Sequence, residues 1–378
     1  MKILYTNFHG AAGIGGHTSY ILRLARALAP QHEIVVAAPP GSALDRLARE
    51  IPGVRFVPQR FPNAPGRAVG ALAPLRALLR REAFDVAHVN GSADHRLVIL
   101  ACLGMGGRRP AIVFTKHNDL PIGALGAAVR ARAGTDRVIG VCDFVTRALQ
   151  QTAYRRCGIA TIANGIDIAH FAPEQGDAAL AQAWRSQWLG ARPQGKLLLG
   201  SNAGTDDYKG WIDLVRGLAQ LPASLRERVH IALAGSEPAQ PLREEVGRLG
   251  LQAQVHYAGR LDDVRPFIAA LDAGFVLSFR VETISFACRE MMAMGKPVLV
   301  SRHAGLPENI DPGRDGWIVP VRDAQALAAW LRQALQGDFD LAAMGRAARA
   351  KAERDFGLAP FVSRTLRVYQ DASAARPA

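Results

Sequence analysis

The chain has 378 residues, of which 49% are hydrophobic and 21% are charged, so its composition excludes a disordered protein and its length predicts two domains. Its net charge of +13 is concentrated in one half, since residues 1–164 carry 21 basic and 9 acidic residues while residues 165–378 carry 25 and 24. Four widely spaced cysteines without a CxxC pair, and no apolar run of about 20 residues, argue against a zinc site, a disulfide framework and a transmembrane helix.

The N-terminal half alternates short apolar strands with amphipathic helices. Strands are predicted at KILYTNF, HEIVVAAPP, VRFVP, DVAHVN, AIVFTKH and RVIGVC, and helices at GGHTSYILRLARALAP and around residues 68–81 and 94–102. Parallel strands need crossover connections, which are usually helices. This alternation therefore predicts an α/β fold with a doubly wound, Rossmann-like sheet.

The C-terminal half repeats the same plan. Strands are predicted at KLLLGSN, VHIALAG, VHYAG, AGFVLSF, KPVLVS and GWIVPV, and helices at residues 211–220, 242–249, 264–271 and 285–294. Between the halves lies TIANGIDIAHFAPEQGD, whose turn-prone Asn-Gly pair and proline suit a junction. We predict domains at 1–168 and 169–355, followed at 356–378 by a last helix that ends near Tyr369 and a frayed tail.

Ligands of doubly wound sheets bind beyond the carboxyl ends of the strands, and two such domains are expected to face each other across a cleft. The first loop, HGAAGIGGHTSY, follows strand one, and its Gly15 and Gly16 allow backbone amides to approach an anion at a helix start. A dinucleotide fingerprint needs glycine where Thr18 stands, which disfavours an NAD site. The alternative is a tight turn that lets the first helix pack closely.

Two side chains follow predicted strands and are candidates for ligand contact. His117 ends AIVFTKH, where it is able to hydrogen-bond a sugar hydroxyl or a carbonyl, although its own loop backbone is an equally good partner. Lys209 follows KLLLGSN and precedes a helix, a position from which lysine reaches a diphosphate as a point charge. An isolated lysine is more often simply solvated.

The segment VETISFACREMMAMGKPVLVS places Glu282 and Glu290 in apolar sequence, where unpaired carboxylates are costly. The residues between them form a turn into a helix whose first amides are suited to phosphate, namely Thr283, Ile284, Ser285 and Phe286. A carboxylate accepts two hydrogen bonds from a diol, so Glu290 suits a ribose and Glu282 a sugar ring. The alternative is an ion pair of Glu290 with Arg289 or another arginine on a solvated face.

These motifs resemble the retaining GT-B glycosyltransferases of family 4, which use nucleotide sugars. The resemblance rests on the E-x7-E spacing of Glu282 and Glu290 with the MMAMGKPVLVS that follows, and on motifs in the family's order: GGHTSYILRLARAL, NGIDIAHFAP, YKGW, HAGLPENI and DGWIVPV. It covers nearly the whole chain. It implies a GT-B fold, two Rossmann-like domains with a C-terminal helix that crosses back to the N-terminal one.

The resemblance also implies residue roles. Catalysis is assigned to Glu282, which binds hydroxyls of the transferred sugar, to His117, which contacts that sugar, and to Lys209, which neutralises the diphosphate. Donor binding adds Gly15, Gly16, the amides of residues 283–286, and Glu290 on the ribose. The resemblance implies no cofactor and no metal, because lysine and helix amides stabilise the leaving diphosphate; the co-substrate is a nucleotide sugar, with UDP favoured.

The chain departs from the family pattern at three places. The family usually carries an arginine shortly before Lys209, and here Arg280 or Arg260 is the candidate replacement. Thr283 stands where the family has glycine, next to the sugar. Asn90 stands where many members have histidine in their DVxHxH segment.

The basic N-terminal half, which in this family holds the acceptor, points to an anionic glycan or glycolipid such as lipopolysaccharide core or a lipid-linked saccharide. We expect a cytoplasmic protein, since the start of the chain lacks a signal-peptide core, peripherally bound to the inner face of the membrane through this half. The alternatives are a merely solvated basic face, a sugar-nucleotide 2-epimerase of similar fold, and a noncatalytic binder of anionic polymers. Nucleic acid is disfavoured because aromatic residues do not interleave the basic ones.

Overall fold

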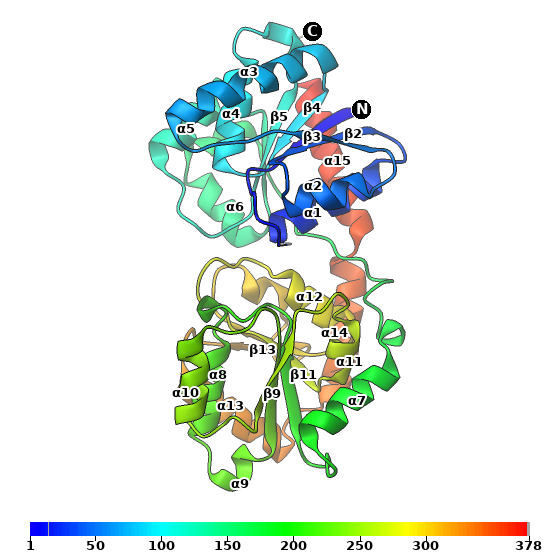
Figure 1. Ribbon diagram of the computed structural model, residues 1–378, viewed down its shortest axis with the longest axis vertical. Coiled ribbons are helices and arrows are strands. Elements are labelled where there is room, and N and C mark those ends of the chain that lie inside the picture. The colour runs from blue at the N-terminus through cyan, green and yellow to red at the C-terminus, as the bar shows by residue number, and fades with distance from the viewer. Residues whose placement is uncertain (14, 376–378) are drawn as a thin grey trace. The chain divides into compact units, whose positions relative to one another are not determined.

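The computed structural model describes residues 1–13 and 15–375, which divide into two compact units (Figure 1). Unit 1 comprises Met1–Gly165 together with Leu358–Ala378, and unit 2 is Ile166–Gly357. The chain therefore passes between units after Gly165 and after Gly357, compared with the predicted boundaries after residues 168 and 355.

Unit 1 is built on a seven-stranded parallel sheet of order β3-β2-β1-β4-β5-β6-β7. Its strands are β1 Lys2–Thr6, β2 Glu33–Ala38, β3 Val54–Pro58, β4 Val86–Val89, β5 Ala111–Lys116, β6 Arg137–Gly140 and β7 Ile159–Thr161. Its helices are α1 Gly16–Leu28, α2 Ala43–Arg49, α3 Pro65–Glu82, α4 Ser92–Cys102, α5 Ala124–Ala133, α6 Asp143–Gln150 and α15 Leu358–Ala374. The central strands are buried almost throughout, as expected for a parallel sheet with both faces covered.

The helices of unit 1 form two groups. α1 contacts α2 and α15, whereas α3 contacts α4, which contacts α5 (Figure 1). Because α1 and α4 lead from the sheet centre in opposite directions, right-handed crossovers place these groups on opposite faces.

The C-terminal helix α15 lies on the sheet of unit 1 against β4 and β5 (Figure 1). The Tyr369 hydroxyl is 2.6 Å from Nδ1 of His88 and donates to the hydroxyl of Tyr5 at 3.0 Å. The prediction of a frayed tail after Tyr369 is wrong for the next residues, because the helix continues to Ala374. Burial of the Ala372 side chain against the core of unit 1 explains the extension. Residues 376–378 of the expected tail lie outside the described residues.

Unit 2 contains a six-stranded parallel sheet of order β10-β9-β8-β11-β12-β13. Its strands are β8 Leu197–Ser201, β9 Val229–Ala234, β10 Val255–Gly259, β11 Ala273–Val276, β12 Val298–Ser301 and β13 Gly316–Val319. Its helices are α7 Ala178–Leu189, α8 Trp211–Ala219, α9 Ala223–Arg226, α10 Gln240–Arg248, α11 Arg265–Ala270, α12 Phe286–Ala293, α13 Ala324–Gln336 and α14 Leu341–Asp355. The predicted fold class of two Rossmann-like units is confirmed.

Both sheets share the doubly wound strand order, in which the chain reverses its direction of travel across the sheet after the third strand. The reversal falls between β1 and β4 in unit 1 and between β8 and β11 in unit 2. Ligands of such sheets bind at this switch point, beyond the carboxyl ends of the strands. Among the described residues, no helix is long and apolar enough to cross a membrane.

Candidate functional site

The switch point of unit 2 carries a lysine and a glutamate in direct contact. Lys209 ends a short 3-10 turn, Asp207–Lys209, that follows β8, and Glu282 lies in the loop after β11. The Lys209 Nζ atom is 2.9 Å from a carboxylate oxygen of Glu282, and the two side chains are only 15% and 12% exposed. Residues 73 positions apart in sequence are thus brought together because β8 and β11 are neighbours.

Gly210 explains how Lys209 reaches this place. Its φ of +69° lies in the left-handed region, and a Cβ built on it would come 2.1 Å from the carbonyl oxygen of Leu277. Only glycine lets the chain pass so close to the end of β11 before α8 begins. The glycine therefore sets the position of the lysine before it.

The turn before α12 is tight and partly strained. Val281 and Ser285 have φ values of +53° and +50°, which residues with a Cβ rarely adopt. Ser285 caps α12, its hydroxyl accepting a hydrogen bond from the amide of Cys288 at 3.4 Å. The amide of Thr283 donates to Glu282 at 3.3 Å, so this carboxylate touches both the turn and Lys209.

Two buried side chains support this turn from the interior of unit 2. Asn309, which is fully buried, donates to the carbonyl oxygens of Ile284 at 2.8 Å and Leu306 at 3.1 Å. Its own oxygen accepts from Nε of Arg289 at 2.9 Å, and the Arg289 guanidinium lies 4.2 Å from the ring centroid of Phe356. We call Arg289 and Asn309 the turn anchor.

Glu290 lies on α12 and accepts a hydrogen bond of 2.9 Å from the side-chain amide of Asn202, just after β8. Arg289, the alternative partner considered for it, directs Nε to Asn309. The unit 2 site therefore consists of Lys209 with Glu282, the turn, and Glu290 with Asn202.

The two candidate replacement arginines differ in their surroundings. Arg280 and Lys209 both lie over the ring of Tyr208, at 5.8 and 5.2 Å from its centroid. Arg260 follows β10 and donates to the hydroxyl of Ser236 at 2.8 Å. Arg280 is thus the candidate that shares a neighbour with Lys209.

In unit 1, Gly15 precedes α1 and Gly16 begins it, beyond the carboxyl end of β1. Apart from its chain neighbours and the backbone of α1 itself, a Cβ added at Gly15 or Gly16 would meet no atom of the described residues within 4 Å. Close packing of α1 therefore does not explain these glycines, and open space in front of the backbone is what a ligand needs. Ile14, between the loop glycines, lies outside the described residues.

His117 follows β5 and lies in a ladder of aromatic rings. Its ring centroid is 4.2 Å from that of His17 and 4.6 Å from that of Tyr20. Its Nε2 atom lies 2.8 Å from the side-chain oxygen of Asn90, which follows β4. Burial, reinforced by neighbouring His17, keeps the pKa of His117 well below 6.5, so the ring is neutral at pH 7.

Asp94, on α4, is buried inside unit 1 and hydrogen-bonds to Asn90, the partner of His117. One of its oxygens accepts from the Thr6 hydroxyl at 2.7 Å and from the Asn90 amide at 2.8 Å. Complete burial raises the pKa of Asp94 to about 7 despite these bonds.

In unit 2 the structure brings together Lys209, Glu282 and Arg280, whereas Arg260 contacts Ser236. Both units also contain site residues that the sequence did not single out. In unit 2 these are Asn202 and Asn309, and in unit 1 they are His17 and Asp94. Position after a strand was a signal for Asn202, whereas Asn309 contacts the turn from about 25 residues away and has no local signal.

The model of Glycosyltransferase Family 4 matches residues 14–170, and that of Glycosyl transferases group 1 matches residues 197–337. A putative colanic acid biosynthesis glycosyltransferase, WcaL of Escherichia coli, is 29% identical over 231 residues, 58% of this chain and 53% of that protein. A phosphatidyl-myo-inositol mannosyltransferase of Mycolicibacterium smegmatis is 26% identical over 334 residues, 86% and 82% of the two chains.

The match to an amylovoran biosynthesis glycosyltransferase of Erwinia amylovora is 47% identical but spans only 20% of this chain and 19% of that one. The chain thus spans about half of the length of WcaL and about a fifth of the length of the amylovoran glycosyltransferase. The structure of Anabaena HepE in complex with UDP superposes with a TM-score of 0.83 at 20% identity, covering 98% of this chain and 100% of that one, which shows the shared fold. With two family models matching successive parts of the chain and two Rossmann-like units beneath them, the chain belongs to glycosyltransferase family 4.

Proposed function

We propose that this chain transfers a sugar from a nucleotide diphosphate donor, with UDP as the nucleotide, to a saccharide acceptor of the lipopolysaccharide or exopolysaccharide type, with retention of anomeric configuration and without a metal. The names of relatives in colanic acid and amylovoran biosynthesis support the acceptor class. The complexes of HepE with UDP and with UDP-glucose support the donor class.

The observation that carries the proposal is the group at the β8–β11 switch point. Lys209 has three donors, of which one is used on Glu282 within the described residues, and the others are proposed to meet the oxygens of a diphosphate. The turn at residues 283–286 leads into α12, whose N-terminal end is positive and favours the same anion. Arg280, beside the same tyrosine as Lys209, is the proposed second cation.

The carboxylates of Glu282 and Glu290 are proposed to accept hydrogen bonds from hydroxyl groups on either side of that diphosphate. Glu290, held by Asn202, accepts from the ribose, and Glu282 accepts from the transferred sugar. As the bond to the diphosphate breaks, charge develops on its oxygens, and Lys209 with the turn amides stabilises that charge most in the transition state. His117 is proposed to contact the transferred sugar, and Gly15 and Gly16 to face the donor or the acceptor.

Calorimetric titration with UDP, GDP and ADP tests the nucleotide part. Glu290→Gln removes the charged acceptor for the ribose, so UDP affinity is expected to fall about 10- to 100-fold, the equivalent of about 1.5–3 kcal/mol for a hydrogen bond to a charged group. Glu244→Gln, on the exposed face of α10, is the matched control and should bind UDP like the wild type. Equal affinity in the Glu290 variant would remove the ribose assignment.

Unit 1 is proposed to hold the anionic acceptor. With its C-terminal segment it carries 24 basic and 10 acidic residues, a net charge of +14, while unit 2 carries 22 and 23, a net charge of −1. The positive charge therefore belongs to one unit, which raises the local concentration of an anionic glycan or glycolipid.

We also propose that unit 1 binds an anionic membrane through the outer side of α3, α4 and α5, named here the α3–α5 face. These helices hold seven arginines and two acids, and both acids are engaged inside the protein: Asp94 is buried, and Glu82 pairs with Lys2 and Arg55. Exposed apolar side chains accompany the arginines, namely Val69, Leu100, Leu103, Leu125 and Val129. Apolar and basic groups together are what an interfacial surface requires.

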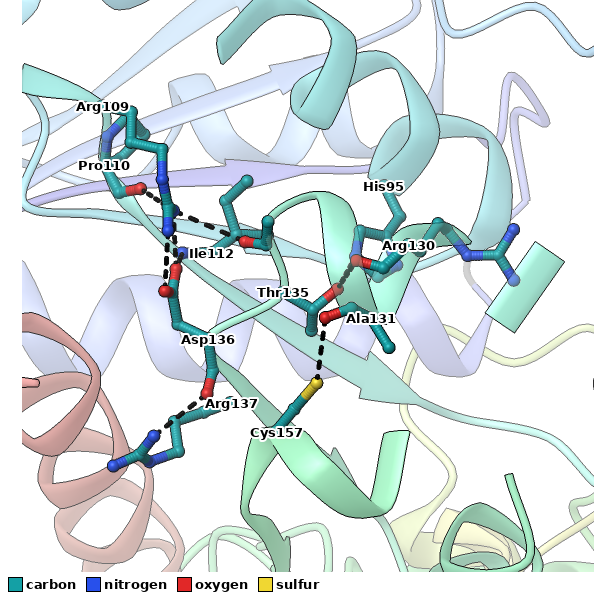
Figure 2. Close-up of polar contacts among 11 residues, drawn as sticks. His95, Arg109, Pro110, Ile112, Arg130, Ala131, Thr135, Asp136, Arg137 and Cys157 are labelled. Atoms are coloured by element: carbon teal, nitrogen blue, oxygen red, sulfur yellow. Dashed lines mark hydrogen bonds and ion pairs between the residues drawn. The ribbon is translucent and has the colours of Figure 1, made fainter. Parts of the chain in front are cut away.

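The helix α5 is held at its C-terminal end, and Ala127 and Ala131 form its buried side. The carbonyl oxygens of Arg130 and Ala131, in its last turn, accept hydrogen bonds from Thr135 and Cys157 (Figure 2). Leu125 and Val129, one turn apart, remain 80% and 56% exposed.

Flotation with liposomes tests this contact. The wild type is expected to float with phosphatidylglycerol vesicles and not with phosphatidylcholine vesicles, and Leu125→Glu/Val129→Glu is expected to abolish flotation. Leu180→Glu, at a 41% exposed leucine of α7 in unit 2, is the control and should float like the wild type. Flotation of the double variant would refute the proposal that unit 1 binds membranes through the α3–α5 face.

A further inference from the structure

The side chain of Asn90 has only one possible orientation. It is 1% exposed, and its nitrogen donates to the carbonyl oxygen of Thr6, at the end of β1, at 3.0 Å and to that of His88, in β4, at 3.3 Å. Carbonyl oxygens accept and never donate, so the amide nitrogen must face them and the amide oxygen must face the other way.

The backbone of Asn90 is held as well. Its amide donates to Asp94, and the same carboxylate oxygen accepts from the hydroxyl of Thr6. The residue is thus fixed to β1, β4 and α4 at once, which makes the position of its side-chain oxygen a property of the sheet.

That oxygen lies 2.8 Å from Nε2 of His117. Because the oxygen can only accept, Nε2 must carry a hydrogen. The ring is neutral, since burial and then the surrounding groups His17, His88, His9 and Lys116 all oppose a second proton. A neutral imidazole has one N–H, so Nδ1 carries a lone pair.

We propose that Asn90 is a positioning residue that holds His117 as the Nε2–H tautomer, so that Nδ1 of His117 accepts a hydrogen bond from a hydroxyl group of the sugar. The identity of the hydroxyl as a sugar hydroxyl rests on the proposed function, whereas the tautomer rests on the hydrogen bond to Asn90 and on the burial that keeps the ring neutral. The sequence allowed either a sugar hydroxyl or a carbonyl group as the ligand partner of His117, and this tautomer selects the hydroxyl. A hydroxyl donates to Nδ1, but a carbonyl or phosphate oxygen has no hydrogen to give.

The tautomer is measured directly by ¹⁵N NMR of the full-length protein labelled at histidine, without any ligand. The two nitrogens of His117 are assigned by their loss in His117→Gln. Between pH 6 and 8 the expected spectrum has a protonated Nε2 and an unprotonated Nδ1. A proton on Nδ1, or a doubly protonated ring at pH 7, would overturn the inference.

The positioning role is tested with Asn90→Leu, which keeps the volume and removes the amide. The Nε2 hydrogen is expected to lose its protection from exchange with water, and kcat/KM with the acceptor to fall about tenfold or more. The affinity of this variant for UDP should not change, because UDP is proposed to bind unit 2 and Asn90 lies in unit 1. Asn63→Leu, at an exposed asparagine before α3, is the matched control.

The outcomes separate this inference from the proposed function. Transfer by Asn90→Leu at the wild-type rate would overturn the positioning role even if sugar transfer is established. If the wild type transfers no sugar, the proposed function fails, while the NMR spectrum of the wild type still decides the tautomer. Because the NMR test uses the wild type, it stands even if Asn90→Leu does not fold.

Discussion

The turn anchor of unit 2 allows a quantitative test by a double-mutant cycle with Asn309→Leu and Arg289→Met. Asn309→Leu leaves two buried carbonyls without their donor and removes the acceptor of the Arg289 Nε–H. Unsatisfied buried groups cost about 1–3 kcal/mol each, so we expect a loss of about 4 kcal/mol after partial relaxation.

Arg289→Met is expected to cost less, about 1–2 kcal/mol, because it takes away a buried charge along with the hydrogen bond. In the double variant the bond between the two side chains is lost only once. Its destabilisation should therefore be smaller than the sum of the single effects by about 2 kcal/mol, the usual strength of a hydrogen bond to a charged group.

The assay uses the distribution of tryptophans. All five, Trp184, Trp188, Trp211, Trp317 and Trp330, lie in unit 2. Urea unfolding followed by tryptophan fluorescence thus reports on Ile166–Gly357 alone, which avoids treating two units as one transition.

Strict additivity of the two substitutions would refute the coupling. Arg346→Met, at an exposed arginine of α14, combined with Asn309→Leu is the additive control. UDP titration of Asn309→Leu tests the effect of the turn anchor on ligand binding, because a loosened turn should bind UDP more weakly. Unchanged UDP affinity would show that the anchor does not hold the turn for the ligand.

Three further outcomes are expected. Gly210→Ala should destabilise unit 2 by more than about 2 kcal/mol in the fluorescence assay and weaken UDP binding, because its Cβ meets the Leu277 carbonyl; a neutral result would contradict the close approach. Burial raises the pKa of Asp94 from 3.8 to about 7, so the folded state holds a proton that the unfolded chain releases, and this group makes unit 1 less stable as pH rises from 4 to 7. Asp94→Asn should remove that dependence, a few kcal/mol across the window, as measured by hydrogen exchange of unit 1 amides, and an unchanged profile would contradict it. Tyr369→Phe should lower the stability of unit 1 by about 1–2 kcal/mol in the same measurement and leave the tryptophan transition in place, and a shift of that transition would refute the assignment of α15.

Much of the fold follows from local sequence pattern. The central strands of both sheets are short apolar runs bounded by glycine or polar residues, and periodicity identified them together with some of the helices that cross between them. The crossover helices α2 and α6 were not predicted. β7 was missed because it has only three residues, none of them fully buried, and α5 because it is rich in alanine with no clear apolar stripe. α14 escaped for a similar reason, since its sequence LAAMGRAARAKAERD is mostly small and charged.

The candidate site was predictable where a side chain follows a strand. Lys209, Glu282 and His117 satisfy that rule, and the structure finds each at its expected edge. What the sequence could not provide is the partner of each group. The contacts of Asn90 with His117 and of Asn202 with Glu290 join residues 27 and 88 positions apart, and depend on which strands are neighbours.

The composition of unit 1 from two stretches of chain has a consequence for its synthesis. The hydroxyl of Tyr369 meets His88 across 281 residues, so a ribosome finishes the whole of unit 2 before it releases the helix that completes unit 1. Synthesis of unit 1 thus begins first and is completed last. Its core stays incomplete while the ribosome translates nearly two hundred residues of unit 2. A stop codon after Gly357 would spare the unit it adjoins in sequence and damage the one that begins at Met1.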